Sequence, residues 1–215
     1  MRRHPRARRM ALRYDPREDL LKLTIPSRLG LAMALRWAGE HGDWIERQRK
    51  GRPEEIRLVP GATIPFDGRE LLLVHEESAS RRVRLEGDTI VTGGPEEAFA
   101  GRVSRWLKEQ ARTILSEETA AMAAAAGVRI AGVSVGDARS RWGSCSSAGR
   151  LRYSWRLVMM PPQVRRYIVA HEVAHRVHMD HGRAFHALEA KLFGGSVREA
   201  KGLLRVWGKR LQRVG

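Results

Sequence analysis

The 215-residue chain has one cysteine and no long apolar run, and both absences restrict what it can be. The single thiol of Cys145 excludes a disulfide within the chain and a zinc finger built from a cysteine cluster. No apolar run approaches the stretch of about 20 residues that a membrane-spanning helix needs. No apolar segment follows the basic residues at 1–10, so a secretory signal is not predicted. We therefore expect a cytoplasmic protein without a membrane partner, in which histidine and carboxylate hold any metal.

Negative charge is also scarce, because 40 lysine and arginine residues stand against 24 aspartate and glutamate residues, a formal net charge of +16. Such an excess is typical of proteins that bind nucleic acid or another polyanion through a basic surface. However, 34 of the 40 basic residues are arginine, and they are spread along the chain without forming one stripe. A compositional bias explains this distribution better, and nucleic acid or another polyanion stays an alternative partner.

The hydrophobic pattern separates a β-rich region with one helix, residues 1–95, from a second domain, residues 96–215. Strand-like alternation and the turn sequences FDGRE and LEGD predict hairpins in the first region. Strand-like segments return over 128–160, interrupted by a loop at 143–149. Helical periodicity with suitable end signals recurs at 27–51, 95–127, 162–179, 183–193 and 196–214. These elements predict an α+β fold in which a small, mostly antiparallel sheet packs against helices.

The segment HEVAHRVHMDHG at 171–182 combines four histidines with two carboxylates. His171 and His175 are four residues apart, so on a helix their imidazoles lie on one side and suit Zn²⁺. Glu172 is rotated about 100° around the helix from His171, so its carboxylate can reach a metal-bound water instead of the metal. The pattern predicts a zinc site in which Glu172 is the general base and later protonates the leaving amine.

A catalytic zinc site needs a third protein ligand and leaves the fourth position to water. His178 continues the helical face but lies about 10 Å along the axis from the first histidine, so we expect it to support the ligands from outside the metal site or to serve packing. His181 is the preferred third ligand, because the adjacent Gly182 permits a left-handed turn that brings the chain back. His186 and Glu189, on the next predicted helix, are the alternative ligands.

Together with these residues, the sequence resembles the YgjP-like metallopeptidase family, also called DUF45. The match consists of RWGSC at 141–145, a strand that ends near a tryptophan and a proline, HEVAH at 171–175 and HGRAF at 181–185. It is strongest over residues 141–188. Zinc peptidases of the SprT and Wss1 type are similar in their H-E-x-x-H helix and nearby third histidine.

The resemblance implies that His171, His175 and His181 bind zinc and that Glu172 is the catalytic base. It also implies that residues 96–215 form a zincin-like metallopeptidase domain of α+β fold. In such a domain the substrate cleft lies between the active-site helix, which carries H-E-x-x-H, and an edge strand.

Two residues of RWGSC, Arg141 and Trp142, are candidates for substrate binding. Arg141 can hold a substrate carboxylate, and the strand at 150–157 can pair with an extended peptide by β-augmentation. The alternative is structural, with Trp142 packed in the core, Gly143 forming a bulge and Cys145 acting as a small buried hydrophobe. The structural alternative is favoured, and the substrate contacts are kept as a hypothesis.

The sequence thus predicts a zinc-dependent metallopeptidase that hydrolyses peptide bonds in protein or peptide substrates. One alternative is a nucleic-acid-associated basic protein with a structural zinc site. Glu172 argues against it, because a structural site gains nothing from a carboxylate beside an open coordination position. A second alternative is a zinc hydrolase of a non-peptide substrate, since an activated water attacks other electrophiles equally well.

Overall fold

The computed structural model describes residues 1–138 and 141–214, which form two compact units, Met1–Glu55 and Ile56–Gly215. Both units combine helices with small sheets, so the predicted α+β class is confirmed. The units divide between Glu55 and Ile56, so the strands between residues 56 and 95 belong to the larger unit. The assignment of a zincin-like domain to residues 96–215 stays a prediction.

The smaller unit is a three-stranded sheet with two short helices. Its elements are β1 (Arg2–His4), β2 (Ala11–Asp15), β3 (Leu20–Pro26), α1 (Leu31–Gly39) and α2 (Gly42–Lys50). The prediction of one helix over 27–51 is wrong, because the chain leaves the helical path between Gly39 and Gly42. Glycine has low helix propensity, so two of them three residues apart weaken a continuous helix. The core of this unit is small and contains Leu23, Ile25 and Ala34.

A four-stranded sheet begins the larger unit and confirms both predicted hairpin turns. Its strands are β4 (Thr63–Phe66), β5 (Arg69–His75), β6 (Arg84–Glu86) and β7 (Thr89–Thr92), in the order β4-β5-β7-β6. The β4–β5 turn places Asp67 and Gly68 at φ 50° and 79°, which suits the two-residue turns of hairpins. The inner pair β5–β7 is parallel, whereas both outer pairs are antiparallel.

A second, three-stranded sheet lies next to the helices of the larger unit. Its strands are β8 (Gly132–Gly136), β9 (Gly143–Cys145) and β10 (Arg150–Ser154), in the order β8-β10-β9. The predicted loop at 143–149 therefore contains a strand, β9. Each of the three sheets has a parallel and an antiparallel pairing, so they are mixed rather than purely antiparallel. Alternation of apolar residues predicts strands but not their partners.

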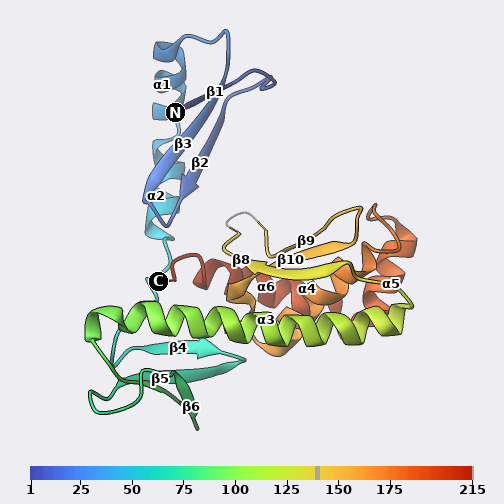
Figure 1. Ribbon diagram of the computed structural model, residues 1–215. Coiled ribbons are helices and arrows are strands. Elements are labelled where there is room, and N and C mark those ends of the chain that lie inside the picture. The colour runs from blue at the N-terminus through green and yellow to red at the C-terminus, as the bar shows by residue number, and fades with distance from the viewer. Residues whose placement is uncertain (139–140, 215) are drawn as a thin grey trace. The chain divides into compact units, whose positions relative to one another are not determined.

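Helices pack between and beside these sheets. They are η1 (Glu96–Ala98), α3 (Phe99–Ala126), η2 (Trp155–Met159), α4 (Pro162–Ala174), α5 (Arg183–Phe193) and α6 (Val197–Arg210). In Figure 1, α3 has the four-stranded sheet on one side and α4, α6 and the three-stranded sheet on the other. α3 ends as predicted at Gly127, which adopts the left-handed conformation with φ 66°.

α4 carries the histidine motif and starts at Pro162, where a missing N–H costs nothing. It ends at Ala174 with His175 as its C-cap, so the predicted extension of the helical face to His178 is wrong. Nearly all of its other side chains are buried, which anchors the motif in the main core. Among the described residues, no helix combines the length and apolar character that crossing a membrane requires.

Candidate metal centre

The structure brings His171, His175 and His181 together at the end of α4 and in the loop before α5. One ring nitrogen from each lies within 4.8 Å of those of the other two. The Nε2 atoms of His171 and His181 are 3.5 Å apart, which is long for a hydrogen bond. The three imidazoles therefore direct nitrogen atoms at one small space.

Hydrogen bonds fix the tautomers of the two helical histidines. Nδ1 of His171 lies 2.7 Å from Oε1 of Glu189, and Nδ1 of His175 lies 3.1 Å from the backbone oxygen of His178. An ionised carboxylate and a carbonyl only accept, so both Nδ1 atoms donate. Burial lowers the pKa of His171, although Glu189 opposes the shift, so this ring is neutral near pH 7. Nε2 of His171 then carries a lone pair, as metal binding requires.

Glu189 contacts the Nδ1 side of His171, opposite the nitrogen that faces the other two histidines. Its side chain is buried, Oε2 lies 3.2 Å from Nδ1 of His186, and Tyr167 also hydrogen-bonds to it. Burial opposes ionisation of this carboxyl, but the hydrogen bonds from His171 and His186 outweigh burial and lower its pKa. Its oxygens are thus engaged away from the three nitrogens. This arrangement favours an orienting role for Glu189 over the role of alternative ligand, and His186 faces Glu189 too.

Phe185 forms the floor of the histidine cluster. It is fully buried on α5, and its ring centroid lies 5.0 Å from that of His171, 4.6 Å from His175 and 4.8 Å from His181. The contact explains the spacing of HGRAF, in which the phenylalanine follows the histidine by four residues. An apolar floor holds the three rings in place without offering a competing hydrogen bond.

The loop that delivers His181 is shaped by Asp180. Oδ1 of Asp180 accepts a hydrogen bond of 2.8 Å from the backbone nitrogen of Gly182. Gly182 has φ −74° and ψ −177°, so the predicted left-handed turn at this residue is wrong. An aspartate that bonds to the backbone two residues on turns the chain without a positive φ.

Glu172 lies in a buried position between α4 and β9. Burial raises the pKa of its carboxyl to about 7, and the positive charge of Arg141 acts in the opposite direction. The side chain lies so close to Gly143 that a Cβ there would be 2.6 Å from its Cγ. The glycine of RWGSC is needed for this approach, and sequence reasoning assigned it only a bulge.

Among the described residues β9 is an edge strand, because its one strand partner there is β10. β10 lies between β8 and β9, so the hypothesis that the strand at 150–157 binds a peptide by β-augmentation is wrong. Both sides of β10 are already occupied by protein strands. The free edge beside the candidate centre belongs to β9, which packs against α4.

The two predicted substrate-binding residues differ in their surroundings. Arg141 is exposed and close enough to Glu172 to influence its ionisation. Trp142 packs against the core, and a Cβ at Gly208 of α6 would be 3.4 Å from its Cζ2. The packing supports a structural role for Trp142, while substrate contacts of both residues stay predictions. Burial raises the pKa of Cys145, which keeps the thiol protonated.

Comparison with known proteins agrees with the motif. The family model described as "YgjP-like, metallopeptidase domain" matches residues 8–206. A solved structure, the metallopeptidase zymogen abylysin of Pyrococcus abyssi, aligns with 19% identity and a TM-score of 0.40. That alignment covers 46% of this chain and 97% of the other. No curated protein matches the chain.

Proposed function

Because the chain belongs to the YgjP-like metallopeptidase family, we propose that it hydrolyses peptide bonds with a zinc ion held by His171, His175 and His181. The observation that carries the proposal is the convergence of their ring nitrogens within 4.8 Å. Zn–N distances of about 2.0–2.1 Å in a tetrahedral site separate two ligand nitrogens by about 3.4 Å. The Nε2 atoms of His171 and His181 are 3.5 Å apart, so the residues fit zinc.

Bound zinc supplies Lewis acidity, which lowers the pKa of a coordinated water toward about 7 and polarises a carbonyl. The protein supplies the base. Glu172 follows His171 on α4, and β9 encloses its carboxyl group. With its pKa raised by burial to about 7, the carboxylate takes the proton of the attacking water and then gives it to the leaving amine nitrogen.

Glu189 prepares the site by holding the Nδ1 proton of His171. The hydrogen bond fixes the ring orientation and raises the basicity of the opposite nitrogen. The backbone carbonyl of His178 has the same role toward His175. These contacts support a preorganised site.

Protein or peptide substrates follow from the family, and the free edge of β9 suits an extended backbone. A peptide paired with this edge would lie beside Glu172, which touches Gly143 of the same strand. Arg141, which precedes β9, could then donate hydrogen bonds to a substrate carboxylate. No observation favours nucleic acid as the substrate.

The test replaces Glu172 by glutamine, which keeps the shape of the side chain but removes the base. We expect cleavage of a diverse peptide mixture, followed by mass spectrometry, to slow by about 10²- to 10⁴-fold, while bound zinc stays at the wild-type level. The exposed Glu199→Gln on α6 is the control and keeps full activity. Full activity in the zinc-loaded Glu172→Gln protein contradicts the mechanism, and a zinc-loaded wild type that cleaves no peptide contradicts the peptidase assignment.

A further inference from the structure

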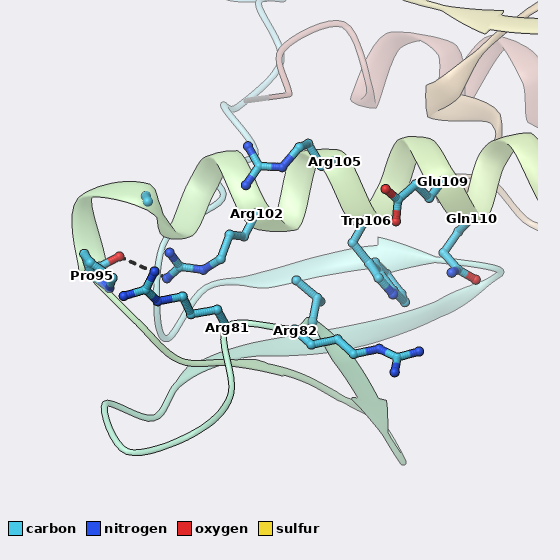
Figure 2. A pocket seen from close by; sticks show the side chains of 10 residues that line it. Arg81, Arg82, Pro95, Arg102, Arg105, Trp106, Glu109 and Gln110 are labelled. Carbon is cyan, nitrogen blue, oxygen red and sulfur yellow. Dashed lines mark hydrogen bonds between the residues drawn. The ribbon is translucent and has the colours of Figure 1, made fainter.

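A second polar site lies in the larger unit, where the loop at 76–83 meets the first turns of α3 around a pocket of about 580 Å³ (Figure 2). Arginine dominates its lining, with Arg81 and Arg82 on the loop and Arg102 and Arg105 on α3. Glu109 is the single carboxylate among these lining residues, and in the described part of the chain it forms no ion pair with them. The pocket therefore carries a large excess of positive charge.

Arg102 is the buried member of this group, with 7% of its surface exposed. Its Nε donates to Oγ1 of Thr92 at 3.3 Å, and its Nη2 donates to the backbone oxygen of Pro95 at 3.0 Å. Both acceptors are neutral, and Nη1 has no partner among the described residues. Nη1 is not a buried atom, so it is open to solvent at the pocket, where an anion would meet a guanidinium that has no carboxylate partner among the described residues.

The loop holds Arg81 in a fixed position next to Arg102. Oγ1 of Thr92 donates to the backbone oxygen of Arg81 at 3.0 Å, so one hydroxyl connects both arginines. The Arg81 side chain lies against Gly94, where a Cβ would be 2.7 Å from its Cγ and where φ is +82°. Figure 2 shows the guanidinium groups of Arg81 and Arg102 turned toward Pro95. The pair is thus arranged before any ligand binds.

We propose that this pocket binds a small molecule with two or more phosphate groups, which lie between Arg81 and Arg102. A phosphate offers oxygens in several directions and accepts from guanidiniums that approach from a loop and a helix, whereas a carboxylate is planar. Trp106 and Val83 provide an apolar wall for the rest of the ligand. The volume lies within the range of about 300–1,000 Å³ that is usual for small-molecule sites. The inference does not depend on the peptidase assignment.

The test is calorimetric titration of the full chain, purified without added zinc, with sodium tripolyphosphate, which would otherwise also chelate zinc. Arg81→Ala is the informative variant, because this guanidinium makes no hydrogen bond within the described residues and its loss leaves the fold intact. We expect saturable binding to the wild type and a loss of affinity of about tenfold or more in Arg81→Ala. Arg112→Ala is the matched control, since Arg112 is exposed on the same helix outside the pocket. It should bind within about twofold of the wild type.

Three results would overturn the proposal. The first is the absence of saturable binding to the wild type. The second is an equal loss in Arg112→Ala and Arg81→Ala, which would assign the binding to overall charge. The third is tighter binding of citrate, a small tricarboxylate, than of tripolyphosphate, which would assign the pocket to carboxylates.

Discussion

The two ends of α4 carry polar clusters that differ in how they are completed. Near its start, the guanidinium of Arg165 is buried and bonded to Glu118 at 2.8 and 3.0 Å and to Asp67 at 2.7 Å. Near its end, three imidazoles turn their nitrogens toward one another. In the first cluster every guanidinium nitrogen has a carboxylate partner within the protein, whereas the second cluster gathers acceptor nitrogens around a space without a donor. A polar cluster that only a cation completes indicates a ligand site, while a completed one indicates a structural role.

The largest effect should come from replacing Gly143 by alanine at the functional end of α4. The new Cβ would overlap Glu172, so the base must move while the histidines keep their positions. We expect peptidase activity to fall by about 10²- to 10⁴-fold, with zinc content unchanged. Gly132→Ala in β8 is the control, because no atom lies within 4 Å of its new Cβ. Equal activity in both variants would show that β9 does not position Glu172.

At the structural end, Arg165→Met should destabilise the protein by about 1–3 kcal/mol, because it leaves the largely buried carboxylate of Glu118 without its cation, while Asp67 can be solvated. Oε2 of Glu118 already has no hydrogen-bond partner among the described residues, so this carboxylate depends on Arg165. Urea unfolding measures the change, with the exposed neighbour Arg166→Met as control. If Arg165→Met were as stable as Arg166→Met, the structural role assigned to the cluster at the start of α4 would be contradicted.

A smaller effect is expected from Glu189→Gln, which keeps an acceptor for His171 but removes the charge. Zinc affinity, measured by competition with a chelator, should weaken by about 10- to 100-fold. His186→Ala separates orientation from ligation, since Nδ1 of His186 faces the far oxygen of Glu189. It should bind zinc nearly as well as the wild type, and a complete loss of zinc would make His186 a ligand instead.

Local spacing predicted much of the functional end of α4. The interval between His171 and His175 corresponds to one helical turn. The periodicity of apolar residues and a proline at the first helical position are sufficient to predict the buried helix from the sequence. The hairpin turns and the end of α3 at Gly127 were predictable for the same reason, because each depends on residues close in sequence.

Several features that sequence reasoning missed depend on contacts distant in the chain. Glu189 is 18 residues from His171, and its hydrogen bond exists only because α5 packs on α4. The sequence did contain one signal for the buried role of Glu189. This carboxylate lies four residues from both Phe185 and Phe193, so it interrupts an apolar helical stripe. The contact of Gly143 with Glu172 and the parallel pairing of β8 with β10 left no comparable local signal.

The measurement that tests the account most directly is the zinc content per chain of the wild type, His181→Ala and His178→Ala. His181 brings one of the three converging nitrogens, whereas His178 contributes its backbone oxygen and can lose its side chain. We expect about one zinc per chain in the wild type and in His178→Ala, and a large loss in His181→Ala. A wild type without zinc, or a His181→Ala protein that keeps it, would contradict the three-histidine site.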